Sequence, residues 1–324
     1  MYSEKHLLDI INSYIDSTQY SEHPDGLYAP IKYTMSLGGK RIRPVLMLMA
    51  YNLYKEKVEE ILPNAAALEM YHNFTLLHDD VMDKADVRRG KPTVHKKWNE
   101  NTAILSGDAM LIIAYQLMTQ NKNAHIAKAI ETFNKATLGV CEGQQYDMDF
   151  ESRIDVTTDE YMEMIRLKTS LLLACALKIG AELAGASEED ADLLYDFGEK
   201  MGLAFQLQDD LLDVYGDPAV FGKQIGGDII CNKKTFMLIS ALSKSNDEQR
   251  STLMSWISKT EFDPKDKIES VTQIYNQIDI KSICIAKIEE LFAKALSSLD
   301  KVNVNEERKR NLTEIANNIM GRNH

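Results

Sequence analysis

The stretch EMIRLKTSLLLACALKIGAELAG, residues 163–185, decides the fold class of this 324-residue chain. Its apolar side chains recur every three or four residues, the period of one face of an α-helix, and Gly185 is a typical helix end. Residues 108–118 and 190–216 show the same period, and residues 93–217 contain none of the chain's seven prolines. Because proline breaks helices, long helices are free to form there. We predict an all-α fold, a single domain over residues 1–324 built as a bundle of about ten or more helices.

Composition excludes several classes of function. A hydrophobic share of 44% with 27% charged residues is typical of a globular protein with a sizeable core. The net charge of −12 argues against nucleic acid or an anionic membrane as a general partner. We see no signal peptide and no run near the ~18 consecutive apolar residues of a membrane span, so we expect no stable membrane insertion. The four cysteines form no C-x-x-C pair, which indicates free thiols in a cytoplasmic protein.

An acidic cluster follows an apolar helical run in HDDVMDKADVRRG, residues 78–90. Like charges repel and burial of carboxylates is costly, so this placement needs a cause. Residues four apart share a helix face, so Asp79 and Asp83 project side by side, with Asp80 next to them. Carboxylates held this way bind hard divalent cations. The alternative is a solvated acidic helix end.

A second cluster repeats the pattern in FQLQDDLLD, residues 205–213, with Asp209, Asp210 and Asp213. Because 130 positions separate Asp79 from Asp209, the two clusters belong to different helices. Two helices of a bundle that each present such carboxylates inward form a shared metal site. Bound metals would neutralise the charge of a phosphate group.

Basic residues flank these acids. The segment GGKRIRP, residues 38–44, contains Lys40 and Arg43, and Arg88 and Arg89 follow the first acidic cluster. Guanidinium groups match phosphate oxygens in pairs, and lysine acts as a mobile point charge. We therefore expect two anions, one diphosphate bound through metals and one bound directly by cations. The alternative is that both arginines only pair with nearby aspartates, Asp83 and Asp86.

A further set of polar residues is weaker evidence taken singly. Lys168 lies in an apolar helix and needs an anionic partner there, whereas Thr169 could simply bond back to a carbonyl of its own helix. The rest of the set is Gln206, Lys223, Asp228 and Lys233.

Together these motifs resemble those of the trans-polyprenyl diphosphate synthase family, from about residue 36 to residue 236 and with a helical continuation. The resemblance implies an all-helical homodimer in which both acidic motifs face a deep central cavity. It also implies chain elongation, in which an allylic diphosphate (dimethylallyl, geranyl or farnesyl) ionises and isopentenyl diphosphate attacks it head-to-tail. In the family the released diphosphate is the expected proton acceptor, so no protein base is required, and His78 is read as a neighbour of the site.

The resemblance also assigns roles to residues. It implies three Mg²⁺ ions per active site, with Mn²⁺ as a possible substitute, held by Asp79, Asp80, Asp83, Asp209, Asp210 and Asp213. The allylic diphosphate would be bound by Arg88, Lys168, Lys223 and Lys233. Isopentenyl diphosphate would be bound by Lys40, Arg43, His72 and Arg89. Thr169 and Gln206 would lie beside the developing carbocation.

Product length depends on the helix that carries the first motif. Phe74 lies five positions before Asp79, Thr75 is small, and Tyr71 lies one helical turn further back. The resemblance to the archaeal geranylgeranyl type favours twenty carbons, with fifteen as the second choice. The alternative is that Phe74 is an ordinary core residue.

Two other classes remain open. A class I terpene cyclase shares the first motif but differs in the second, and a non-catalytic subunit of a heteromeric synthase would lose acids that are present here. The C-terminus has Arg322 but no dense basic tail, so closure of the isopentenyl site by such a tail is not expected.

Overall fold

The computed structural model describes residues 1–217 and 225–321, and these residues are almost entirely helical. The prediction of an all-α fold with more than ten helices is confirmed. The longer helices are α1 (Glu4–Ser17), α2 (Asp25–Ser36), α3 (Ile42–Asn52), α4 (Leu62–Met82), α6 (Glu100–Gln120), α7 (Ile126–Ser152), α8 (Thr158–Ile165), α9 (Leu171–Ala184), α10 (Glu188–Tyr215), α13 (Phe236–Lys244), α14 (Asp247–Ser258), α15 (Pro264–Gln277), α16 (Ile280–Lys301) and α17 (Glu306–Met320).

The chain divides into two compact units, each assembled from separate stretches of sequence. Unit 1 comprises Met1–Phe133, Cys175–Leu194 and Asn303–Leu312. Unit 2 comprises Asn134–Ala174, Tyr195–Val302 and Thr313–His324. Helices α7, α9, α10 and α17 contribute residues to both units. The assignment of residues 1–324 to one domain remains a prediction.

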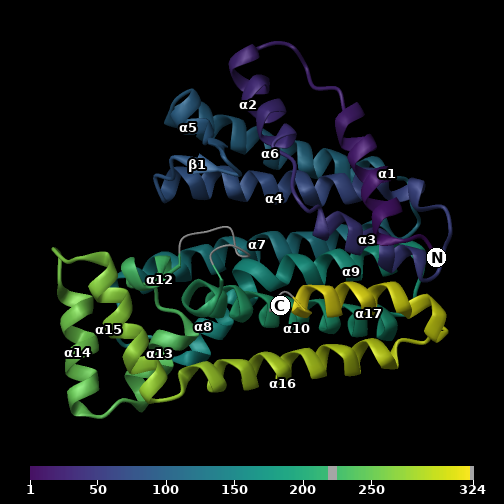
Figure 1. The fold of residues 1–324 in the computed structure, drawn as a ribbon. Coiled ribbons are helices and arrows are strands. Elements are labelled where there is room, and N and C mark those ends of the chain that lie inside the picture. Colours follow the sequence, from purple (N-terminus) through teal and green to yellow (C-terminus); the bar gives the residue numbers. More distant parts are fainter. Residues whose placement is uncertain (218–224, 322–324) are drawn as a thin grey trace. The chain divides into compact units, whose positions relative to one another are not determined.

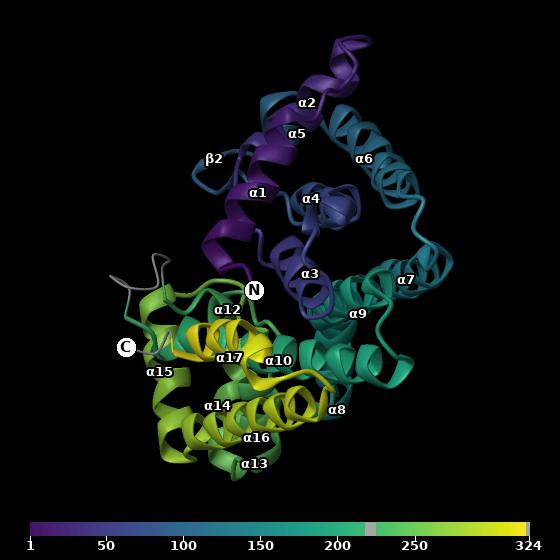
Figure 2. The same cartoon turned by 90° about the vertical axis from the view of Figure 1, so that its right-hand side faces the viewer.

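Helix α4 is the centre of unit 1. Pro63 lies in its first turn, where the missing N–H costs nothing, and its apolar positions from Ala65 to Leu77 are largely buried. Helices α1, α2, α3 and α6 pack around it (Figure 2). Its C-terminal end carries the first acidic motif, in which Asp79 is half-buried, Asp80 is buried and Asp83 is exposed.

A short hairpin follows α4, although the sequence predicts no strands. Its strands are β1 (Val87–Arg88) and β2 (Lys91–Pro92), paired antiparallel. Arg89 and Gly90 form the connection with φ values of 52° and 74°. Two successive residues with positive φ are typical of the tight turn that matches the twist of a hairpin. The hairpin therefore depends on the backbone conformation of its turn. The alternation of apolar and polar residues, which predicts longer strands, gives no sign of it.

Unit 2 has its core among α8, α10, α13, α15 and α16 (Figure 1). Helix α8 begins with a capping box, in which Thr157 and Glu160 satisfy each other's backbone N–H groups. The short helix α12 (Gly227–Ile230) packs against α15. The second acidic motif, on α10, contacts α12, because Asp213 accepts a hydrogen bond from the backbone N–H of Asp228.

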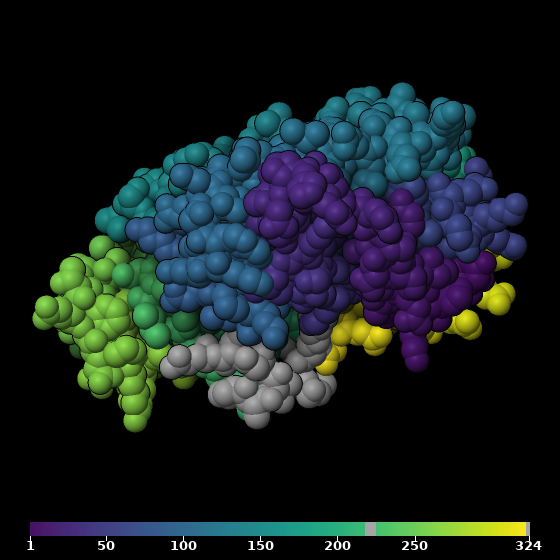
Figure 3. All heavy atoms as spheres, turned by 90° about the horizontal axis from the view of Figure 1, so that it is seen from above, coloured from purple at the N-terminus to yellow at the C-terminus, as the bar shows by residue number. Residues whose placement is uncertain are grey.

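Helix α6 is long and apolar enough to cross a membrane by length and composition, but a core helix passes the same test. It packs against α4, α2 and the short helix α5 (Val94–Lys97) within unit 1. In the space-filling view, the purple residues of α1 and α2 lie on the surface of this unit (Figure 3). Packing inside unit 1 therefore accounts for part of the apolar surface of α6.

Candidate functional site

Unit 1 contains a pair of residues that the sequence assigns to direct anion binding. The Nη1 atom of Arg43 lies 3.2 Å from Nε2 of His72. Because a guanidinium only donates, Nε2 is the acceptor and the proton of His72 sits on Nδ1. Burial, reinforced by Arg43 and neighbouring arginines, holds the pKa of His72 well below its usual value.

Arg43 itself has unused capacity to bind an anion. Its Nε atom is buried without a hydrogen-bond partner among the described residues. Burial lowers the pKa of Arg43 to about 10, so the side chain is still charged at neutral pH. A buried, charged donor without a hydrogen-bond partner destabilises the protein unless a ligand accepts a hydrogen bond from it. This geometry fits a bound diphosphate oxygen.

The glycine pair before Lys40 allows Arg89 to approach the same loop. Arg89 donates a hydrogen bond from Nη1 to the carbonyl oxygen of Gly38. Gly39 has a φ of 143°, and a Cβ atom there would lie 3.0 Å from Nη2 of Arg89. The structure thus brings Arg89 against the loop that carries Lys40, which is exposed. The unit places all the residues predicted for isopentenyl diphosphate on α3, α4 and the two adjoining loops.

The first acidic motif separates into a buried and an accessible part. Asp80 is 5% exposed, and both of its oxygens accept hydrogen bonds from Nε of Arg88 at 2.8 Å. Nη2 of Arg88 also lies 3.7 Å from Asp79. Asp79 is half-buried and Asp83 is exposed. Arg88 therefore pairs with Asp80 and Asp79, and Asp86 pairs with Lys96 at 2.8 Å.

The second acidic motif, in unit 2, divides in the same way. Asp210 is 2% exposed, and its carboxylate accepts hydrogen bonds from the hydroxyl of Tyr161 and, at 3.1 Å, from Nε2 of Gln206. Burial is the main cause that raises the pKa of Asp210 to about 7. Asp209 and Asp213 are half-buried, and Asp213 accepts a hydrogen bond from the backbone N–H of Asp228 at 3.0 Å. In both motifs the middle aspartate is buried and hydrogen-bonded, and the outer two are at least partly exposed.

The donor chemistry of these motifs fits Mg²⁺. The accessible aspartates offer only oxygen ligands, which hard cations prefer. Within residues 1–217 and 225–321, no three His, Cys, Asp or Glu side chains converge as a ready-made metal cage. Mg²⁺ does not require one, because it usually takes one or two carboxylates together with water and phosphate oxygens.

Lys168 and Thr169 lie in a π-helical segment, Arg166–Ser170, between α8 and α9. Such wide turns often occur at functional sites. Two glycines let neighbouring helices approach it, because a Cβ atom on Gly143 would lie 2.4 Å from the backbone nitrogen of Lys168 and one on Gly202 would lie 2.7 Å from Cα of Ser170. The spacing RLKTS alone gives no sign of the π turn.

The sequence predicts that Lys168 has an anionic partner. In the structure this partner is Asp147 of α7, whose Oδ2 lies 2.6 Å from Nζ of Lys168. Thr169 does not bond back to its helix, since its hydroxyl donates to Oε1 of Gln206 at 3.2 Å. The amide of Gln206 therefore links Thr169 to Asp210. These contacts assemble the residues predicted to lie beside the carbocation into one hydrogen-bonded set.

Lys233 lies in the loop after α12, and its Nζ is 3.9 Å from Oδ1 of Asp228. Lys223, predicted to bind the same diphosphate, lies outside the described residues, as does Arg322.

Two residues in these contacts were not predicted from the sequence, namely Asp147 and Tyr161. Both residues lie in helices that contain other acidic or aromatic side chains. Only the folded structure shows that Asp147 pairs with Lys168 and that Tyr161 donates to Asp210. A search for the missing carboxylate partner of Lys168 on the other helices would have found Asp147 as one of several candidates.

The residues predicted to set product length belong to an aromatic cluster in unit 1. The rings of Phe74 and Tyr71 have centroids 5.4 Å apart, and Tyr71 lies 5.6 Å from Phe133 of α7. Tyr71 is 1% exposed and Phe133 is fully buried. Thr75 donates from its hydroxyl to the carbonyl oxygen of His72 at 2.8 Å. The contact of Phe133 with Tyr71 could not be predicted from the sequence.

His78 behaves as a packing residue of α4. Its Nε2 lies 3.0 Å from the carbonyl oxygen of Ile104, and its ring packs edge-on against Phe74 at 4.8 Å. Gly107 makes this approach possible, because a Cβ atom there would lie 2.2 Å from Nε2 of His78.

Comparison with solved structures places this fold among known enzymes. A crystal structure of geranylgeranyl pyrophosphate synthase matches all of this chain and all of its own with a TM-score of 0.94 and 42% identity. The geranylgeranyl pyrophosphate synthase of Corynebacterium glutamicum, crystallised with isoprenyl diphosphate and magnesium, matches with a TM-score of 0.85 and 27% identity over 98% of each chain.

Sequence comparison agrees. The short chain isoprenyl diphosphate synthase of Methanocaldococcus jannaschii is 38% identical over 325 residues, covering 99% of this chain and 96% of that protein. The geranylgeranyl diphosphate synthase of Methanosarcina mazei is 42% identical over 236 residues, covering 72% of this chain and 73% of that protein. The model of the polyprenyl synthetase family matches residues 24–278, and the chain belongs to that family.

Proposed function

We propose that this protein is a Mg²⁺-dependent prenyltransferase that condenses isopentenyl diphosphate head-to-tail with an allylic diphosphate to give a short all-trans prenyl diphosphate. One observation carries the proposal: in both acidic motifs the middle aspartate is buried and hydrogen-bonded, and the outer two are at least partly exposed at the end of an apolar helix. A merely solvated helix end would not satisfy its second acid so completely. Relatives named as geranylgeranyl and short-chain isoprenyl diphosphate synthases support the same activity.

The metal ligands follow from this division. Asp79, Asp83, Asp209 and Asp213 would hold the metal ions, while Asp80 and Asp210 would act through the side chains that they orient. Three Mg²⁺ ions are proposed per active site, with Mn²⁺ as a possible substitute. When bound, the ions would stabilise the negative charge that develops on the departing diphosphate.

The protein's own residues then divide between two substrates. Arg88, Lys168, Lys223 and Lys233 are proposed to bind the allylic diphosphate, whose C–O bond breaks to leave a carbocation. The second substrate, isopentenyl diphosphate, is assigned to Lys40, Arg43, His72 and Arg89. Preorganised cations stabilise charge where it appears without reorganising during the reaction.

Carbon–carbon bond formation joins the allylic cation to isopentenyl diphosphate, and the product then loses a proton. The released diphosphate is proposed as the proton acceptor. Thr169 and Gln206 would lie beside the cation, where the hydroxyl of Thr169 donates to Oε1 of Gln206 and Nε2 of Gln206 donates to Asp210.

A product of twenty carbons is favoured, with fifteen as the second choice. Support comes from the aromatic ring of Phe74, about one to two turns back from Asp79 along α4, which packs on Tyr71, and Tyr71 in turn packs on Phe133. Relatives named as geranylgeranyl diphosphate synthases agree with this choice.

A cytoplasmic homodimer is proposed. Ile104, Leu105 and Ile112 of α6 are 45%, 61% and 60% exposed, and positions seven or eight apart lie on the same side of a helix. Exposed apolar faces of this kind often mark association surfaces. All four cysteines are free thiols, which fits a reducing compartment.

The test is an incubation of purified protein with Mg²⁺, labelled isopentenyl diphosphate and dimethylallyl, geranyl or farnesyl diphosphate in turn. Elongated, labelled prenyl diphosphates are expected, and their chain length reports the product. A terpene cyclase would release hydrocarbon or alcohol from the allylic substrate without incorporating label. A non-catalytic subunit would form nothing on its own, and either result would overturn the proposal.

A further inference from the structure

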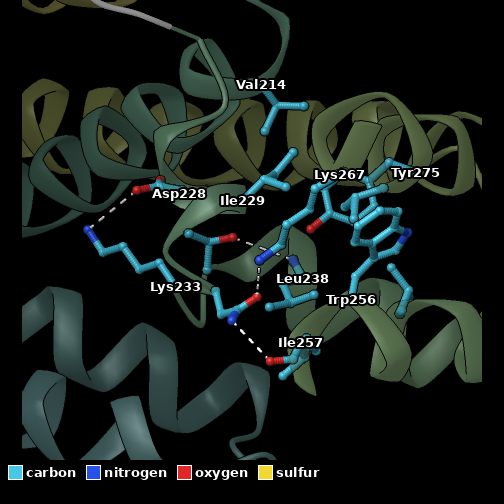
Figure 4. Close-up of a pocket in the computed structure, with 13 residues that line it drawn as sticks. Val214, Asp228, Ile229, Lys233, Leu238, Trp256, Ile257, Lys267 and Tyr275 are labelled. Carbon is cyan, nitrogen blue, oxygen red and sulfur yellow. Dashed lines mark hydrogen bonds and ion pairs between the residues drawn. The ribbon is translucent and has the colours of Figure 1, made fainter. Parts of the chain in front are cut away.

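Lys267, on α15 of unit 2, is a buried lysine in a place that no motif explains. Its side chain is 1% exposed. Its Nζ donates to Oδ1 of Asn232 at 2.7 Å (Figure 4). It also donates to the carbonyl oxygen of Ile230 at 3.0 Å and lies 4.3 Å from the ring centroid of Phe262. These partners are neutral. A buried ammonium is costly, so its presence indicates that the contacts it makes matter for function or folding.

The two acceptors are neighbours in the chain: Ile230 is the last residue of α12, and Asn232 lies in the turn that connects α12 to α13. Asn232 has a left-handed backbone with a φ of 56°, a conformation that asparagine tolerates better than most residues. Its side chain is fixed at both ends, because Oδ1 accepts from Lys267 and Nδ2 donates to the carbonyl oxygen of Ile257 at 3.2 Å. The turn is therefore anchored by polar contacts to α14 and α15.

Packing alone does not hold this turn. A cavity of about 20 Å³, lined by Asn232, Lys233, Lys267 and apolar side chains, lies beside it (Figure 4). This is room for about one water molecule. If the ammonium were absent, the side chain of Asn232 would have space to rotate away from its present position.

Lys233 leaves the turn directly after Asn232. Its backbone N–H donates to the carbonyl oxygen of Asp228 at 2.9 Å, and its side chain points toward the carboxylate of Asp228 (Figure 4). The backbone N–H of Thr235 donates to the carbonyl oxygen of Lys233 at 2.9 Å, just before α13 begins. The direction of the Lys233 side chain thus depends on the turn that Lys267 anchors.

We infer that Lys267 is a positioning residue for diphosphate binding: it anchors the turn at residues 230–232 and so sets the position of Lys233. The inference rests on the proposed function for the role of Lys233 in binding the allylic diphosphate. Lys267 itself faces the interior of unit 2 and would act only through the turn.

The experiment measures binding of inorganic diphosphate in Mg²⁺ by calorimetry, together with the KM for each substrate. Lys267→Met, which keeps the length of the side chain and removes the charge, should weaken diphosphate binding and raise the allylic KM, each about tenfold, the effect of losing one well-placed contact. The KM for isopentenyl diphosphate should not change. Lys265→Met, at an 82% exposed lysine of the same helix, is the matched control and should bind as the wild type does.

A double variant distinguishes positioning from general damage. If Lys267 acts through Lys233, the Lys233→Met/Lys267→Met protein should bind diphosphate no more weakly than Lys233→Met alone. Asn232→Gly tolerates the left-handed backbone but lacks the anchored amide, so it should reproduce the loss seen in Lys267→Met. This variant provides the same test if Lys267→Met does not fold.

The possible results distinguish a positioning role of Lys267 from general damage to the protein. Additive losses in the double variant, equal changes in both KM values, or unaltered binding by Lys267→Met and Asn232→Gly would each overturn the inference. If the wild-type protein binds diphosphate but elongates no allylic primer, the proposed function fails, while the binding measurements still decide the role of Lys267.

Discussion

The Nη1 atom of Arg41 lies 2.6 Å from Oε1 of Glu69, and both side chains are only 3% exposed. The same oxygen accepts a hydrogen bond from Nδ2 of Asn73 at 3.0 Å, and Nη2 of Arg41 donates to the carbonyl oxygen of Met35 at 2.9 Å. Arg41 has a φ of 49° and directly precedes the first residue of α3. The buried pair therefore fixes the left-handed residue beside Lys40.

Arg41→Met should be strongly destabilising, because it leaves the charge of Glu69 buried without its partner. A loss of about 3–5 kcal/mol in the free energy of unfolding is expected. The Arg41→Met/Glu69→Met double variant should recover much of that loss, since apolar residues of similar volume often replace a buried ion pair without cost. Denaturant unfolding of the two variants and of Glu69→Met alone measures the coupling, and strictly additive losses would contradict it.

This pair also shows what the sequence could not reveal. The segment GGKRIRP presents Lys40, Arg41 and Arg43 as similar cations, and the sequence assigned the first and the last to an anion site. Arg41 differs because Glu69, 28 positions later, meets its guanidinium in the folded protein. Residue type is visible in a motif, whereas the role of a charge depends on its tertiary partner.

The same contrast holds for secondary structure. Helical periodicity is local, so the sequence predicted the helices around residues 163–185 and the acidic ends of α4 and α10. The π turn at residues 166–170 depends on the close approach allowed by Gly143 and Gly202, and the hairpin depends on positive φ at Arg89 and Gly90. Neither the close approach at the two glycines nor the positive φ values produce a periodic pattern in the sequence, so periodicity could not predict these two features.

The metal ligands can be tested by removing one outer aspartate from each motif. Asp79→Ala and Asp209→Ala should each lower turnover about 10³-fold, since a loss of about 4 kcal/mol of transition-state stabilisation is expected for a metal ligand. Substrate binding should weaken only modestly. Steady-state kinetics at saturating Mg²⁺ measure both quantities.

Asp247→Ala, in the first turn of α14 and part of neither motif, serves as the control for loss of an acid. It should leave turnover unchanged. Near-normal turnover of both Asp79→Ala and Asp209→Ala would show that these motifs do not hold catalytic metals.

His72 should make stability depend on pH. Burial first, and Arg43 next, hold its pKa well below the ordinary value of about 6.5, so the native state resists protonation that the unfolded chain accepts. The unfolded state then binds more protons below about pH 6.5, and the free energy of unfolding should fall as the pH drops through that range. One proton corresponds to a slope of at most about 1.4 kcal/mol per pH unit.

His72→Gln keeps an acceptor for Arg43 but cannot titrate, so its stability should fall less steeply between about pH 6.5 and pH 5. His23→Gln, at an exposed position, is the matched control and should keep the wild-type slope. Unfolding curves across this range measure all three proteins. Identical slopes for the wild type and His72→Gln would show that His72 does not carry the pH dependence.

Product length provides the last test, and it depends on the aromatic cluster of α4. If the prenyl chain grows from the metal end of this helix toward its start, residues 75, 74 and 71 lie ~6, ~7.5 and ~12 Å back from Asp79 at ~1.5 Å per residue. Phe74 then forms the first barrier, and Tyr71, backed by the fully buried Phe133, forms the second.

Phe74→Ala should therefore lengthen the main product by one or more isoprene units without abolishing turnover, and growth should stop at Tyr71. Thr75→Phe is the matched change in the opposite direction: it places a ring about 1.5 Å closer to the metals and should shorten the product toward fifteen carbons. Chromatography of the labelled products, after removal of the diphosphate, measures both shifts. If an active, folded Phe74→Ala enzyme makes the wild-type product, Phe74 is an ordinary core residue, and the barrier to growth lies elsewhere, with Tyr71 the next residue to change.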